Sequence, residues 1–135
     1  MRKTVLASHG AFAEGAYDSV SMIIGAQENV RTYHMHPGEN ASDFAETLRK
    51  EITSEPETEF VILTDLFGAS VCSAMTELSV YSNVKVFSGM NLCMILEILS
   101  GYPEKLSNQD VEDILTTARE GVKCIAMEQI EEEDF

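Results

Sequence analysis

The feature that most constrains the fold is the apolar run at residues 60–64, which reads Phe, Val, Ile, Leu, Thr. A strand with one solvated face alternates apolar and polar side chains, whereas an unbroken apolar run is typical of a strand that is buried on both faces. Such strands belong to parallel sheets with helices on both sides. The run ends at Asp65, so a carboxylate directly follows the strand that we expect to be most buried.

The rest of the chain alternates between strand-like and helix-like patterns. The predicted strands are 4–7, 30–35, 60–64 and 84–87; the predicted helices are 14–26, Asn40 or Ser42 through Ile52, 70–80, 92–99, and Ser107 or Asn108 through Arg119. Short connections between such elements imply right-handed βαβ units. The sequence therefore predicts a three-layer α/β fold: an open, mostly parallel sheet with helices on both faces.

Residues 122–127 form a last β-competent segment with a different role. The preceding helix is predicted to close at Gly121, which leaves too little chain for another crossover, so the segment reaches only an edge of the sheet as an antiparallel strand. An exposed apolar edge invites aggregation. We therefore expect it to pair with a second subunit in a two-fold homodimer. A single domain is expected over 1–127, followed by a solvated acidic tail at 128–135.

Charge and composition exclude several classes of function. Nine basic and 23 acidic residues give a formal net charge of −14. This charge repels phosphate backbones and anionic lipid, and it favours a basic partner protein or simply solubility. We expect a cytoplasmic protein, because the sequence shows neither a long apolar run nor a signal peptide. Three cysteines without a C-x-x-C spacing predict neither disulfides nor a zinc site, only small core side chains.

The polar residues that could bind a ligand or take part in a reaction follow the ends of the predicted strands, at 8–10, 36–38, 65–70 and 88–91. In an open parallel sheet these loops gather at one edge, where ligands bind. His9 at that edge could be a nucleophile, a base, a metal ligand or a packing residue. Asp65 is the one carboxylate placed directly at these strand ends. A carboxylate that accepts one ring N–H would fix the tautomer of His9 and leave its other nitrogen reactive.

Each of these residues also has a purely structural interpretation. Asp65 could serve only as a turn or N-cap residue, and Ser70 could be an ordinary helix cap rather than a donor to a bound anion. His34 and His36 alternate on one strand, which with His9 is a weak metal signal. The chain lacks a Gly-x-Gly-x-x-Gly loop after its first strand, a Walker lysine and a nucleophile elbow. Nucleotide-binding and hydrolase functions therefore lose their usual support.

Six stretches carry a family resemblance: TVLASHG at 4–10, GAQENV at 25–30, PGENA at 37–41, TDLFGAS at 64–70, GMNL at 89–92 and REGV at 119–122. In order and spacing they resemble the IIA domains of the mannose family of the bacterial phosphoenolpyruvate:sugar phosphotransferase system (PTS). The resemblance implies a small α/β domain and a homodimer that exchanges a C-terminal strand. It also implies that the carrier protein HPr phosphorylates His9, which passes the phosphoryl group to a IIB protein, with the membrane components IIC and IID involved only indirectly.

The expected mechanism is in-line phosphoryl transfer through a phosphohistidine. Neutral His9 attacks the phosphoryl group, while Asp65 holds the other ring N–H and stabilises the cation. Ser70, with the adjacent backbone donors of Gly68 and Ala69, screens the phosphate oxygens. No metal or organic cofactor is expected.

The sequence departs from the family after the aspartate, where Ala69 and Val71 stand in place of a glycine and a proline. Alanine restricts φ, and the lost proline removes a preset φ, so loop shape and partner fit are expected to change more than the chemistry. We also expect a stand-alone IIA subunit without a fused IIB region.

Two alternatives stay open. One is the phosphotransferase subunit that feeds a dihydroxyacetone kinase, although Gly10 favours the sugar branch because the related strand end reads Ser-His-Ser. The other is a regulatory module that keeps the fold without transferring phosphate, and the altered loop at 69–71 is its only support.

Overall fold

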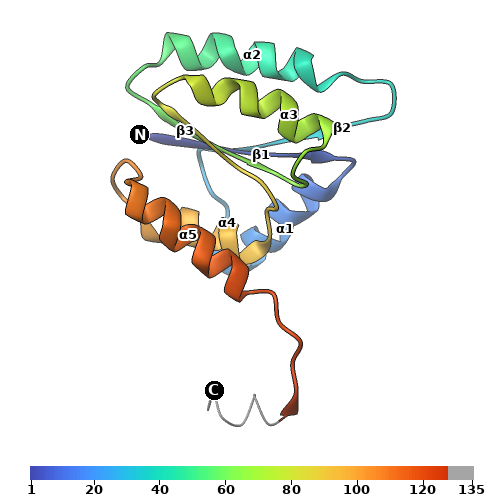
Figure 1. Cartoon of the computed structure of the whole chain (residues 1–135), viewed down its shortest axis with the longest axis vertical. Coiled ribbons are helices and arrows are strands. Elements are labelled where there is room, and N and C mark those ends of the chain that lie inside the picture. The colour runs from blue at the N-terminus through green and yellow to red at the C-terminus, as the bar shows by residue number, and fades with distance from the viewer. Residues whose placement is uncertain (128–135) are drawn as a thin grey trace.

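The computed structural model describes residues 1–127 and has a three-layer α/β fold (Figure 1). The strands are β1 (Arg2–His9), β2 (Val30–Met35), β3 (Glu59–Thr64) and β4 (Val84–Phe87), and the helices are α1 (Phe12–Ile24), α2 (Ala41–Ser54), α3 (Ser70–Thr76), the 3-10 helix η1 (Glu77–Val80), α4 (Leu92–Gly101) and α5 (Asn108–Glu120). The helices and the first four strands predicted from the sequence are confirmed. Two elements differ most in extent: the first strand, predicted at 4–7, spans Arg2–His9, and the helix predicted over 70–80 changes to 3-10 geometry at Glu77.

The four strands form one sheet in the order β2-β1-β3-β4. Every neighbouring pair is parallel, and Ala7 of β1 lies beside Thr64 of β3. All six residues of β3 are buried, as the apolar run predicts. Because β1 and β3 are adjacent and parallel, their carboxyl ends meet at the same edge of the sheet.

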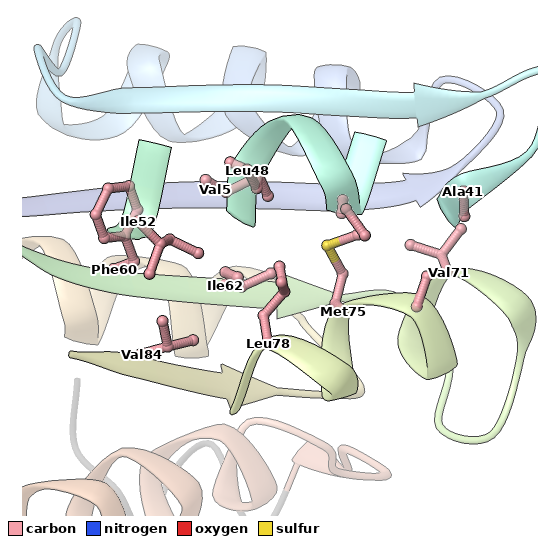
Figure 2. Packing of buried hydrophobic residues seen from close by; sticks show 13 residues of the cluster. Val5, Ala41, Leu48, Ile52, Phe60, Ile62, Val71, Met75, Leu78 and Val84 are labelled. Carbon is pink, nitrogen blue, oxygen red and sulfur yellow. The ribbon is translucent and has the colours of Figure 1, made fainter. Parts of the chain in front are cut away.

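Both faces of the sheet are covered by helices, which confirms the predicted layers. Val5 of β1 belongs to the same core cluster as Leu48 of α2 and Met75 of α3 (Figure 2). The next residue, Leu6, points to the other face and packs in the cluster that contains Ile95 of α4. Figure 1 shows α2 and α3 on one side of the sheet and α1, α4 and α5 on the other. Within residues 1–127 no helix has the length and apolar character needed to cross a membrane.

Two helix starts are fixed by the side chains that the sequence indicates. The Oδ1 atom of Asn40 accepts the backbone N–H of Ser42 at 2.9 Å, so Asn40 rather than Ser42 is the N-cap of α2. Ser107 and Asp110 form a reciprocal capping box at the start of α5. Each pair satisfies backbone donors that a helix leaves unpaired at its first turn. The cap at Asn40 ends the loop after β2, and the cap at Ser107 ends the connection from α4 to α5.

The predicted fifth strand is not formed in this single chain. Residues 122–126 have no regular secondary structure, and Figure 1 shows the segment after α5 leaving the body of the domain. Among the described residues the sheet therefore ends at β4 on this side. Pairing with a second subunit needs a second copy of the chain and stays a prediction. The acidic stretch 128–135 lies outside the described residues.

Gly121 follows α5, but its conformation differs from that of the left-handed cap that the pattern predicts. Its φ is −73°, which any residue adopts. The constraint is space, because a Cβ at Gly121 would lie 2.5 Å from the Sγ atom of Cys93. The cysteines also differ from expectation: Cys72 is buried, Cys93 is partly buried and Cys124 is exposed. The prediction of a core side chain is therefore wrong for Cys124.

Candidate active site

His9 and Asp65 meet where β1 and β3 end. His9 is the last residue of β1, and Asp65 directly follows β3. The Oδ2 atom of Asp65 accepts the backbone N–H of His9 at 2.8 Å and lies 2.9 Å from Nδ1 of the same imidazole. Two contacts from one carboxylate oxygen fix both the backbone and the ring of the histidine. The structure thus brings together the two residues that the sequence analysis pairs.

The electrostatics of this pair determine which ring nitrogen is available. Burial alone would raise the pKa of Asp65, but hydrogen bonds from the backbone and ring of His9, with the charge of the imidazole, lower the pKa below its ordinary value. Asp65 is therefore an acceptor, and Nδ1 of His9 carries a hydrogen toward it. The imidazole side chain is 41% exposed and that of Asp65 only 15%. The Nε2 atom, with its lone pair, is consequently the ring nitrogen that Asp65 leaves available to another group.

Ser70, the first residue of α3, lies on the open side of the ring. Its Oγ atom is 3.3 Å from Nε2 of His9. With Nδ1 protonated, the hydroxyl is the donor in this contact. Gly68, two residues before Ser70, has a φ of +81°, a conformation that favours glycine. This residue lets the chain turn from Asp65 into α3 and places the hydroxyl beside the ring.

The two departures from the family pattern fit this loop without distortion. Ala69 has φ −82° and ψ 170°, which is extended backbone open to any residue, so the expected restriction of φ has no effect here. Val71 lies in the second position of α3, not the first, and is fully buried in the core cluster beside Ala41 (Figure 2). Both residues therefore fit the backbone that this loop adopts, and the expected change in partner fit stays a prediction.

The other two strand-end loops also reach this edge. The backbone N–H of Gly10 donates to the carbonyl of Met35 at 3.0 Å, which joins the end of β2 to the turn after His9. The backbone N–H of Met90 donates to the carbonyl of Thr64 at the same distance of 3.0 Å, which joins the loop after β4 to the end of β3. The predicted convergence of the four loops is confirmed.

Comparison with models of protein families shows the family to which the chain belongs. The model described as "PTS system fructose IIA component", named EIIA-man, matches residues 3–115. The chain belongs to this mannose-type IIA family. The curated relatives include the mannose-specific EIIAB component of Escherichia coli K12, which is 30% identical over 130 residues, and the sorbose-specific EIIA component of Klebsiella pneumoniae, which is 34% identical over 100 residues.

The lengths of these relatives differ. The IIA chain described here aligns over 94% of its own length but spans only 40% of the E. coli protein, whereas it aligns over 73% of both chains with the Klebsiella protein. Among solved structures, EIIA from Streptococcus agalactiae has a TM-score of 0.81 at 30% identity, covering 92% of this chain and 97% of that one. The IIA protein associated with the fucose utilization operon of Streptococcus pneumoniae has a TM-score of 0.77 at 29% identity, covering 91% and 92%.

His34 of this IIA chain lies on β2, and His36 follows the end of that strand; the two side chains contact each other. Their rings pack edge to face with centroids 4.5 Å apart, and Nδ1 of His34 is 3.8 Å from a carboxylate oxygen of Glu14. Within residues 1–127 no group of three histidine, cysteine or acidic side chains is arranged to hold a metal ion. The three histidines therefore do not form the metal cluster that their spacing leaves open.

Sequence reasoning missed Ser8, whose side chain shapes the turn after His9. Its hydroxyl is fully buried and accepts the backbone N–H of Ala13 at 2.8 Å. The N-cap residue of α1, Ala11, has no side-chain acceptor. Ser8, three residues before it, supplies the acceptor that an N-cap side chain would otherwise provide. The sequence signal for this role was a serine placed shortly before a turn and a helix start.

Four exposed apolar side chains, here called the apolar rim, belong to the loops and helix starts that follow the carboxyl ends of the strands: Phe12, Leu66, Phe67 and Leu92. Leu66 is 62% exposed and Phe67 83%, although both are large apolar side chains that directly follow Asp65. Phe12 and Leu92 line a groove of about 310 Å³ between the starts of α1 and α4. Exposed apolar residues clustered beside a reactive group are typical of a surface that binds another protein.

The altered pKa of Asp65 predicts a pH-dependent contribution to stability. Because the folded pKa lies below the unfolded value of about 3.9, the contribution is present above that value and is lost as the pH falls through the folded pKa. Asp65→Asn should therefore lower the free energy of unfolding by about 1 kcal/mol near neutral pH, and the difference should vanish once the pH falls below the folded pKa of Asp65. Urea denaturation across this range measures it. The exposed Asp18→Asn is the matched control, and a pH-independent difference for Asp65→Asn would contradict the electrostatic origin.

Proposed function

We propose that this chain is a phosphoryl carrier of the sugar phosphotransferase system and that His9 carries the phosphoryl group. One observation supports the choice of residue above all others: Asp65 holds Nδ1 at 2.9 Å, and Nε2 is on the open side of a ring that is 41% exposed. The family membership supports the type of reaction. A histidine with one nitrogen fixed by a carboxylate and the other exposed is suited to nucleophilic attack on phosphorus.

In the proposed reaction, Nε2 of His9 forms a bond to phosphorus while the bond between phosphorus and the donor's leaving nitrogen breaks. The hydrogen on Nδ1 stays in place, so positive charge develops on the ring as the new bond forms. The carboxylate of Asp65 stabilises that charge in a partly buried setting. The hydroxyl of Ser70, 3.3 Å from Nε2 in the resting site, turns to donate to a phosphoryl oxygen. Transfer to the acceptor reverses these steps.

The proposed donor is HPr and the proposed acceptor is a IIB protein. Any protein that brings a phosphorylated side chain to Nε2 must lay its surface over the region around His9, and the apolar rim would then be buried. The net charge of −14 favours a partner with a basic surface and would speed the encounter at low salt. Nonpolar contact at the centre with charge complementarity around it matches a transient interface.

Neither alternative gains support from the described residues. The altered loop is the sequence feature that favours a non-transferring regulatory module, and Ala69 adopts an ordinary extended conformation there. Gly10, which favours the sugar branch over a dihydroxyacetone kinase subunit, has a φ of +53° at the turn after His9. A residue with a Cβ would be strained at this φ.

The first test is phosphorylation with phosphoenolpyruvate, enzyme I and HPr, followed by intact mass. The wild-type chain should gain one acid-labile phosphoryl group, and His9→Ala should gain none because it lacks the nucleophile. His36→Asn, which changes an exposed histidine directly after β2, should be labelled like the wild type. Acid-labile label that persists in His9→Ala would refute the assignment.

We also propose that the chain is a homodimer in which residues 122–127 pair with β4 of the second copy. Among the described residues β4 has a neighbouring strand on one side only. A groove of about 520 Å³ runs along it and is lined by Phe87, Met94 and Leu115 among others. The C-terminal segment exposes Val122 and Ile125, at 77% and 67%. An apolar segment without a partner and an unpaired strand edge beside an apolar groove are complementary.

Truncation after Gly121 tests this assembly. The shortened chain should be a monomer or should lose solubility, because the edge of β4 and its groove are then left uncovered. Light scattering gives the mass in solution, and a thermal melt reports the stability. A soluble dimer with unchanged stability after the cut would rule out the exchange.

A further inference from the structure

The seven methionines differ widely in exposure. Met1, Met22 and Met127 are exposed by 70% or more, and Met75, Met90 and Met94 are buried. Met35, the last residue of β2, is partly buried. Unlike the exposed methionines, which lie at the chain ends or near the end of α1, Met35 is at the edge of the sheet that carries His9.

The thioether of Met35 contacts the reactive side chains indirectly, through Ser70. Its Sδ atom lies 3.9 Å from Oγ of Ser70, and this Oγ lies 3.3 Å from Nε2 of His9. The position of Met35 is fixed, because its carbonyl accepts the backbone N–H of Gly10 at 3.0 Å and its Cα lies opposite His9 in the sheet. The hydroxyl of Ser70 thus has two neighbouring acceptors, an imidazole nitrogen and a sulfur.

The chemistry of the sulfur decides between these acceptors. A thioether sulfur is a weak acceptor, so the hydroxyl of Ser70 is free to donate to His9 or to a phosphoryl oxygen. A peroxide transfers one oxygen atom to Sδ: a sulfur lone pair forms the S–O bond, the O–O bond breaks, and water or an alcohol leaves. The sulfoxide carries a strongly polar oxygen directly on Sδ, next to Ser70. That oxygen competes with the phosphoryl group for the hydroxyl of Ser70.

We propose that Met35 is a reversible oxidation site through which peroxides slow phosphoryl transfer at His9. The inference rests on the proposed function of His9 and adds a modification site to it. Loss of one hydrogen bond to the transferring group should slow transfer about fivefold. The effect is local, because the exposed Met22 can be oxidised without altering any group that contacts His9. Methionine sulfoxide reductases reverse the modification, so the slowed carrier can be restored without new synthesis.

The experiment compares transfer rates from phosphorylated HPr before and after treatment with hydrogen peroxide. A thiol reductant is added after oxidation so that reversible cysteine products do not contribute. Peptide mass mapping locates the added oxygen atoms. Met35→Leu keeps the size of the side chain and removes the sulfur, and Met22→Leu is the matched control on an exposed helix surface.

The proposal predicts that the oxidised wild type and the oxidised Met22→Leu variant slow about fivefold. Both should regain their rate after treatment with methionine sulfoxide reductases, and Met35→Leu should keep its rate throughout. In Ser70→Ala, whatever its basal rate, oxidation should cause no further change. Oxidation of Met35 without a change in rate, equal slowing of Met35→Leu, or no oxygen on Met35 would each overturn the proposal. If the untreated protein accepts no phosphate at all, the proposed function fails and this inference fails with it.

Discussion

The site depends on one carboxylate oxygen that accepts two hydrogen bonds from the same histidine. Oδ2 of Asp65 fixes both the backbone N–H and Nδ1 of His9, at 2.8 and 2.9 Å. This requires β1 and β3 to be adjacent, parallel and in the register that places Ala7 beside Thr64. Adjacent parallel strands at the centre of a sheet require apolar cover on both faces, which the two core clusters provide. The layered core and the orientation of the imidazole are therefore consequences of one topology.

The same carboxylate also carries an energetic cost. Its second oxygen, Oδ1, is buried without a hydrogen-bond partner among the described residues. An unpaired buried acceptor costs about 1–3 kcal/mol. A site built only for stability would pair that oxygen or place an apolar residue there. A carboxylate directed at a single histidine is instead suited to stabilise a ring that becomes cationic, as the proposed transfer of a phosphoryl group to Nε2 requires. We interpret the cost as part of the function.

The fold and the central pair could be predicted because they follow from local patterns. The unbroken run at 60–64 requires cover on both faces, and His9 and Asp65 each follow a strand, so parallel topology alone brings them together. Met35 could not be assigned a role, since the direction of a side chain at a strand end depends on the packed turn rather than on spacing; for Ser8, only its place before a turn and a helix start gave a signal. The exposure of Leu66 and Phe67 could not be predicted either, because large apolar side chains are usually buried and only the folded loop shows that these two are not. The strand predicted at 122–127 is not formed in the single chain, and its pairing with a second subunit stays a prediction.

The central claim is that Asp65 determines which nitrogen of His9 reacts. The most direct measurement is heteronuclear magnetic resonance of the phosphorylated protein with ¹⁵N-labelled histidine, in which coupling between nitrogen and phosphorus identifies the bonded atom. Our account predicts phosphorus on Nε2, with Nδ1 still protonated and hydrogen-bonded to Asp65. Phosphorus on Nδ1 would contradict it, because the contact of 2.9 Å between Nδ1 and Oδ2 would then have to break before the reaction.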